Sequence, residues 1–137
     1  MIPEIGHILL ILTFVASILQ VLFWCFNIKK SDDITINVLI KSTFINFVFI
    51  LFSFGILVYS FIISDFSLVI VSDNSHTLKP LIYKISGTWG NHEGSLMLWI
   101  LILSFFTFLV SRKKHQISYK LLSSIIGIQT IILCLFL

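Results

Sequence analysis

Long apolar runs separated by short polar segments make up almost the whole chain. A helix that crosses a membrane needs about 20 mostly apolar residues. Four runs are close to this length, at residues 5–26, 40–63, 94–110 and 121–137. The pattern therefore predicts an all-α integral membrane protein with about four transmembrane helices, which together form a single membrane domain over residues 1–137.

Three polar segments connect these runs. The first, NIKKSDDITIN, and the third, SRKKHQISYK, are short, whereas residues 64–92 form a longer segment that contains Pro80. Within it, FSLVIV at residues 66–71 is apolar and rich in β-branched side chains. Such a stretch favours a short strand, and it can also lie along the membrane surface. We expect one of these two arrangements.

Basic residues concentrate in the first and third polar segments. Lysine and arginine collect on the inner side of membrane proteins. The middle segment has Lys79 and Lys84 over a greater length, offset by Asp65 and Asp73. The N-terminus and residues 64–92 are therefore predicted to lie on the outer side, which is the periplasm or the intermembrane space. The other two segments face the cytoplasm or matrix. The remaining cations lie in these segments or flank them: Lys29, Lys30, Lys41, Arg112, Lys113, Lys114 and Lys120.

Composition agrees with a membrane location. Hydrophobic residues make up 58% of the chain and charged residues 11%, against about 25% charged in soluble domains. A soluble chain of 137 residues has too little interior to bury so much apolar surface. The net charge is +3, and the basic residues lie next to the apolar runs. This charge gives no basis for nucleic-acid binding. Cys25 and Cys134 lie in separate runs without metal-binding spacing, so we interpret them as small buried apolar residues.

The segment SGTWGNHEGSLMLW, from Ser86 to Trp99, differs from the rest of the chain and holds the candidate functional motif. His92 can ligate a metal or haem iron or carry a proton, and Glu93 adds a carboxylate. On a helix these neighbours point about 100° apart, so they would not converge on one ion, and we predict no metal site. The other motif residues are Trp89, Gly90, Gly94 and Ser95. The Trp89 ring can pack on an aromatic ligand. On a helix, Gly90 and Gly94 would share a face and permit the close approach of another group.

The same motif also suits the start of a membrane helix. Asn91 or Ser95 can cap the first turn, where free backbone N–H groups need acceptors. Glu93 in that turn would favour the positive end of the helix dipole, and Trp89 is typical of a membrane–water interface. The sequence alone leaves the functional and the architectural interpretation open. Nothing in it resembles a nucleophile–base pair, so no catalytic residue is assigned.

Other polar residues have simpler interpretations. His7, at the outer end of the first run, is expected at the membrane interface. Asn46 and Gln129 lie inside apolar runs and are typical of helix–helix hydrogen bonds. In the middle segment, His76, Lys79 and Lys84 can pair with an anionic ligand such as haem propionates, but a solvated surface is the simpler expectation.

Two stretches resemble a known family. The opening MIPEIGH and the segment SDFSLVIVSDNSHTLKPLIYKISGTWGNHEGSLMLW are similar to the N-terminal region of the CcmF/NrfE family, the haem lyase subunits of cytochrome c maturation. The resemblance covers nearly the whole chain, with a departure at Lys79, where the family often has Leu. The matching elements are Pro3-Glu4-Ile5-Gly6, Asp65-Phe66-Ser67, Asn74-Ser75, Lys79-Pro80 with Tyr83, and Trp89 to Ser95.

The resemblance implies a role in cytochrome c-type biogenesis, in which haem is attached covalently to C-x-x-C-H motifs of apocytochrome c on the outer face of the membrane. That membrane is the bacterial inner (cytoplasmic) membrane or the mitochondrial inner membrane. The family's tryptophan-rich segment and haem-ligating histidines lie beyond the region matched, and the tryptophans here are Trp24, Trp89 and Trp99. We therefore assign no haem ligand and expect haem as a cofactor through an assembled complex. The chain is not expected to be catalytic by itself.

Family members are several times longer, and this chain stops inside an apolar run. We therefore expect a split or truncated gene, with the remaining part of the haem lyase as a separate chain in the first case. The other implied partners are further cytochrome c maturation proteins, apocytochrome c and membrane lipid, but no nucleic acid.

Two alternatives stay open. One is a non-functional truncated remnant. The other is a small accessory membrane subunit of a quinone- or proton-handling complex. The accessory subunit is disfavoured because a proton path would need carboxylates at membrane depth, and no Asp or Glu lies in the core of a predicted span.

Overall fold

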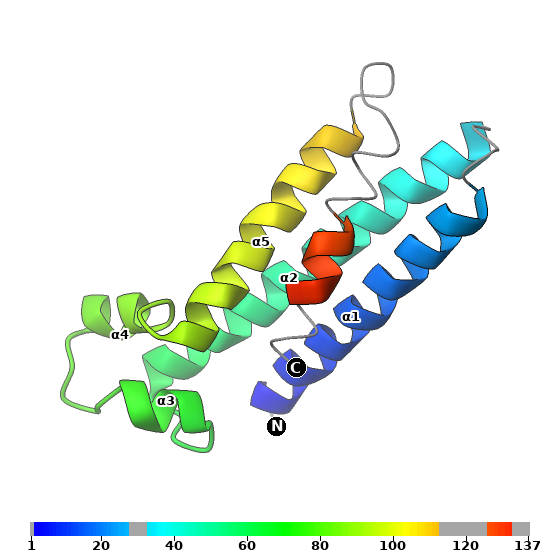
Figure 1. The fold of residues 1–137 in the computed structure, drawn as a ribbon. Helices are drawn as coiled ribbons and strands as arrows, with labels where there is room; N and C mark the ends of the chain where they lie inside the picture. The colour runs from blue at the N-terminus through cyan, green and yellow to red at the C-terminus, as the bar shows by residue number, and fades with distance from the viewer. Residues whose placement is uncertain (1, 28–32, 113–125, 133–137) are drawn as a thin grey trace.

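The computed structural model describes residues 2–27, 33–112 and 126–132. Within these ranges the regular structure is entirely helical (Figure 1). The helices are α1 (Ile2–Asn27), α2 (Asp33–Ile63), α3 (Val69–Asn74), α4 (Leu81–Gly87) and α5 (His92–Ser111). Residues 126–132 are also helical. Figure 1 shows α1, α2 and α5 side by side as a bundle, with α3 and α4 at one end of it, which we call the α3/α4 end.

Three helices are long and apolar enough to cross a membrane. Their candidate spans are Pro3–Phe23, Ile40–Ile63 and His92–Ser111. The prediction of an all-α membrane protein is thus confirmed, and these three spans lie close to their predicted positions. Most of the fourth predicted span, at residues 121–137, falls outside the described residues. The predicted orientation and the total number of spans stay predictions.

The stretch at residues 66–71 does not form a strand, so that one of the two expected arrangements was wrong, whereas a position along the membrane surface stays a prediction. After α2 the chain turns at Ser64, whose φ is 56°, and Asp65 then accepts hydrogen bonds from the Ser67 hydroxyl and backbone N–H. This turn leads into α3, and Val71 on α3 is fully buried. Because local hydrogen bonds already satisfy this backbone, the β-branched residues have no need of a partner strand.

The last part of the first polar segment, residues 33–37, is helical and does not form a connection between two helices. Helix α2 begins at Asp33, seven residues before its candidate span starts at Ile40. An α-helix satisfies its own backbone groups in water and in lipid alike, so a polar sequence outside the bilayer can continue the helix of the span.

Contacts between the long helices form a small apolar core. Helix α2 packs against both α1 and α5, and it also contacts α4. The buried side chains of Leu10, Ile50, Met97 and Ile100 meet at the centre, and Ile132 packs against them. Ile126 packs separately against the apolar side chains Val21 and Val110. Residues 126–132 therefore lie against α1 and α5.

A line of polar side chains also faces the inside of the bundle. Most of the hydroxyl groups donate to a backbone carbonyl three or four residues earlier in their own helix. Lipid offers no hydrogen-bond partners, so inward placement of these groups avoids a large desolvation cost. The buried polar residues of this line are Thr13, Ser17, Gln20, Thr43, Asn46, Ser53, Ser60, Ser104, Thr107, Ser111 and Gln129.

Three of these polar contacts join different helices. The Asn46 Nδ2 donates to Gln20 Oε1 at 2.7 Å, which confirms the helix–helix hydrogen bond predicted for Asn46. The Ser53 hydroxyl donates to the Gly6 carbonyl at 2.7 Å, and the hydroxyls of Thr43 and Ser111 are 3.0 Å apart. These contacts tie α2 to α1 twice and to α5 once.

Gln129 lies beside the amides of Gln20 and Asn46 at one small void. Its side chain is buried, but within the part of the chain that the structure describes its Nε2 has no hydrogen-bond partner. Its predicted helix–helix hydrogen bond therefore remains a prediction.

We predict that Gln20 and Asn46 are energetically coupled. Replacing either residue with Leu should lower the free energy of unfolding by about 1 kcal/mol, because the remaining amide is left buried without its partner. The double variant Gln20→Leu/Asn46→Leu should lose less than the sum of the two. Unfolding by SDS titration in mixed micelles measures these values, with the outward-facing Phe52→Leu as a control. Strictly additive losses would contradict the coupling.

Candidate functional site

The connection between α4 and α5 contains the predicted motif, and Asn91 organises it. Asn91 has an extended backbone and is the N-cap of α5, with its Oδ1 accepting from the Gly94 N–H at 2.6 Å. Its Nδ2 donates to the Gly87 carbonyl at 3.1 Å. One side chain thus holds both the last residue of α4 and the first turn of α5. The prediction of Asn91 as a cap is confirmed.

Ser95 has a different role from the cap considered for it. Its hydroxyl donates to the His92 carbonyl at 2.8 Å, and the residue is half-buried. Trp89 lies just before the cap and is 40% exposed. That partial exposure agrees with the amphipathic environment expected for a tryptophan at an interface.

Gly94 allows a close approach within the motif rather than between helices. It is buried, and a Cβ atom at this position would collide with the backbone carbonyl of Thr88. Gly90 lies in the connection before α5 begins, so the expectation that Gly90 and Gly94 share a helix face was wrong. The connection folds back on the first turn of α5, and the missing side chain of Gly94 makes room for it.

The two ionisable motif residues point to different surroundings. His92 and Glu93 both lie in the first turn of α5 and are exposed, and the carboxylate at this position favours the positive end of the helix. Glu93 also lines a cavity of about 230 Å³, together with His7 of α1. His92 is not one of the lining residues. As expected from their spacing, His92 and Glu93 do not converge.

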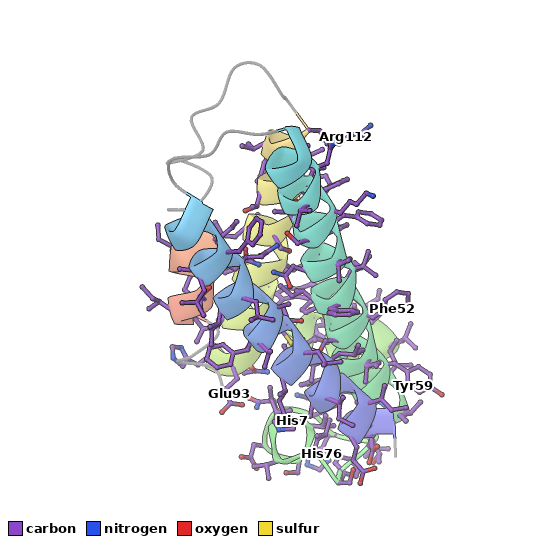
Figure 2. The ribbon with its side chains drawn as sticks, turned by 90° about the vertical axis from the view of Figure 1, so that its right-hand side faces the viewer. His7, Phe52, Tyr59, His76, Glu93 and Arg112 are labelled. Carbon is purple, nitrogen blue, oxygen red and sulfur yellow. The ribbon has the colours of Figure 1, made fainter. Side chains whose placement is uncertain are left out.

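This cavity lies at the α3/α4 end and joins parts of the chain that are far apart in sequence. His7 and Glu93 are labelled near this end in Figure 2. Ser53 also lines the cavity, but its hydroxyl is already bonded to the Gly6 carbonyl. The site therefore combines one imidazole and one carboxylate with an apolar wall, which includes Leu10, Ile56, Leu57, Leu68, Ile70 and Met97.

His7 was interpreted from sequence as an interfacial residue, and no local signal marks it as part of a site. Its partner in the cavity comes from α5, so only the tertiary packing brings the two together. His76 lies in the exposed segment between α3 and α4 and does not line this cavity.

The lysines of the middle segment are engaged in local contacts. Lys84 Nζ donates to the Ser64 hydroxyl at 2.7 Å, and Lys79 Nζ donates to the Asn74 carbonyl at 2.9 Å.

Hydrogen bonds from the Ser67 hydroxyl and backbone N–H hold the pKa of Asp65 below its usual value. Asp65 and Ser67 thus have a clear structural role in the turn that follows α2.

We compared two cavities lined by described residues with the needs of a haem site, and neither has its features. Haem needs a large pocket and an axial ligand such as histidine, cysteine or methionine. The cavity at Glu93 contains His7, but its 230 Å³ is below the roughly 300–1,000 Å³ of pockets for drug-sized ligands. The other, of about 570 Å³ between α1 and α2, is lined by Ala16, Leu19, Gln20, Leu22, Phe23, Val38, Ser42 and Ile45, none of them a haem ligand.

Metal binding is not indicated in the described ranges either. There, no group of three or more His, Cys, Asp or Glu side chains is arranged to hold a metal ion. The cavity lined by His7 and Glu93 can instead orient a polar group at the surface, while its apolar wall contacts an apolar group.

The fold and the capped motif define a class of multi-pass helical membrane protein with a small amphipathic cavity at one end. Over 94% of its length the chain is 38% identical to the cytochrome c-type biogenesis protein CycK of Rhizobium meliloti. Over 96% of its length it is 36% identical to CcmF of Pseudomonas aeruginosa, and over 76% it is 35% identical to NrfE of Haemophilus influenzae. No family model matches the chain.

A solved structure shows the same fold. The cytochrome c haem lyase CcmF superposes with a TM-score of 0.88 and 25% sequence identity, over 98% of this chain and 23% of that chain. The chain belongs to the CcmF/NrfE family of cytochrome c-type biogenesis proteins. It spans 19% of the length of CycK and 20% of that of CcmF.

We predict that Gly94→Ala disrupts the turn before α5. The added methyl group must displace the Thr88 backbone, and overpacking of this kind costs about 1–3 kcal/mol. The matched control is Gly55→Ala in α2, where a Cβ atom meets nothing within 4 Å. Thermal unfolding in detergent should show a lower midpoint for Gly94→Ala and an unchanged or higher one for Gly55→Ala. Equal midpoints would contradict the close approach at Gly94.

Proposed function

We propose that the chain acts in cytochrome c-type biogenesis as the N-terminal membrane part of a haem lyase. The match to CycK, CcmF and NrfE over most of its length carries this proposal. The chain would help to build the outer platform on which haem is attached to apocytochrome c. Ligation of haem would come from the rest of the assembly, because neither cavity described above combines sufficient volume with an axial ligand.

The site at the α3/α4 end supports a role in positioning. His7 and Glu93 are exposed at the cavity that they line. A carboxylate can accept hydrogen bonds or pair with a cation, and an imidazole can change its charge between about pH 5 and 8. We infer that these two side chains orient a polar group of the haem–apocytochrome assembly. The apolar wall beside them would exclude water from that contact.

The remaining parts of the platform would come from other polypeptide segments. The chain spans about a fifth of the length of its relatives. We propose that the segments corresponding to the rest of the lyase, whether on a separate chain or not, complete the platform. Other maturation proteins and apocytochrome c would then meet this assembly at the outer face of a bacterial inner membrane or a mitochondrial inner membrane. The distribution of lysine and arginine supports placing the α3/α4 end on that face.

We predict that Glu93 matters more than its neighbour His92 for cytochrome c maturation. In cells that lack the chain, the wild-type gene should restore covalently haem-stained cytochrome c. Glu93→Gln and His7→Ala should each restore several-fold less, because each removes an ionisable group from the cavity. His92→Ala is the matched control, because His92 shares the turn but does not line the cavity.

Immunoblots of the membrane fraction must show equal amounts of each variant, so that lower maturation reflects lost function. Normal maturation in cells without the chain would contradict the proposed role altogether. Full activity of Glu93→Gln together with loss in His92→Ala would instead contradict the assignment of the site.

A further inference from the structure

Helix α4 and Leu78, which lies shortly before it, expose an apolar surface. Leu78 is 93% exposed and Ile82 is 76% exposed, and Leu81 and Tyr83 are exposed as well. We call Leu78, Leu81, Ile82 and Tyr83 the α4 patch. Large exposed apolar surfaces of this kind mark contacts with a protein or with a membrane. Neither His7 nor Glu93 belongs to this surface, so it is distinct from the cavity described above.

The chain itself keeps the α4 patch near the bilayer. Only residues 88–91 separate α4 from the candidate span that begins at His92. The connection is also folded, because Asn91 Nδ2 donates to the Gly87 carbonyl and the Thr88 carbonyl lies against Gly94. The headgroup region on each side of the hydrocarbon core is about 5–8 Å thick. The end of α4 therefore lies within or just beyond the headgroup region.

The position of α4 relative to the bundle also fits a surface location. In Figure 1, α4 lies to one side of the first turn of α5 and outside the outline of the three long helices. Lys84 fastens it to Ser64 at the end of α2, and Gly87 lies close to the ring of Phe61. These contacts hold α4 beside the bundle, at the level where lipid headgroups surround it.

Charge and residue type favour lipid over a protein partner. Residues 78–91 contain two lysines and no acidic residue. Lysines beside exposed apolar side chains are typical of helices that lie in the membrane interface, where they attract anionic lipids. Tyr83 and the nearby Trp89 have the amphipathic rings that concentrate at the headgroup level.

We propose that the α4 patch rests on the outer lipid surface of the membrane that the bundle crosses. Leu78, Leu81 and Ile82 enter the boundary between headgroups and acyl chains. Tyr83 lies at the headgroup level, and the exposed Lys79 lies near lipid phosphates. This contact fixes the depth of the α4–α5 connection and hence the height of the capped turn above the bilayer.

Fluorescence quenching in vesicles tests this contact. The full chain with Cys25→Ser and Cys134→Ser carries a single NBD label at Ile82→Cys, or at Asp73→Cys on the exposed surface of α3 as the matched control. The vesicles contain phosphatidylcholine with or without phosphatidylglycerol. One quencher is a lipid spin-labelled near the top of its acyl chain, and the other is aqueous iodide.

We expect the spin-labelled lipid to quench the Ile82 label several-fold more than the Asp73 label, and iodide to show the opposite order. Phosphatidylglycerol should strengthen the lipid quenching, and Lys79→Gln should reduce that increase. An Ile82 label as open to iodide as the Asp73 label would overturn the proposal. Protection from both quenchers would also overturn it and would show that a protein, such as a second copy of this chain, covers the patch.

Discussion

The structure depends on one constraint. The lipid around the helices offers no hydrogen-bond partners, so polar groups must bond within the protein. The apolar side chains of the three long helices interact equally well with lipid and with one another, so they cannot alone decide how the helices pack. The inward polar side chains do so. Asn46 bonds Gln20, Ser53 bonds the Gly6 carbonyl, and Thr43 meets Ser111. These contacts fix α1 and α5 on either side of α2, and the cavity at their shared end follows from that arrangement.

The motif before α5 combines an architectural role with the positioning role that we propose. Asn91 and Gly94 are explained by the capped turn, since one supplies the bonds and the other supplies the space. Glu93 is not needed for the cap, and it lies at the cavity with His7. The turn therefore presents a carboxylate at a fixed place beside an apolar wall. In our proposal this geometry helps to position the reactants of haem attachment, with haem held by other segments.

The sequence predicts the parts of the fold that depend on local patterns. Apolar run length located the spans at α1, α2 and α5, and residue type identified Asn91 as a cap and Asn46 as a bonding residue. The helix at α3 could not be predicted in this way, because the turn at Asp65 outweighs the β-branched preference of the residues after it. The position of His7 and Glu93 at one cavity and the contact between Gly94 and Thr88 depend on how the chain folds back. Spacing along one helix carries no information about either.

Our central proposal is that this chain helps to position the reactants of haem attachment and does not itself ligate haem. The most direct measurement is the visible spectrum of the chain purified in detergent, alone and together with the polypeptide that carries the family's tryptophan-rich segment. The account predicts a haem Soret band only for the pair, and the same band when the chain carries His92→Ala. A Soret band from the chain alone that disappears in His92→Ala would contradict it.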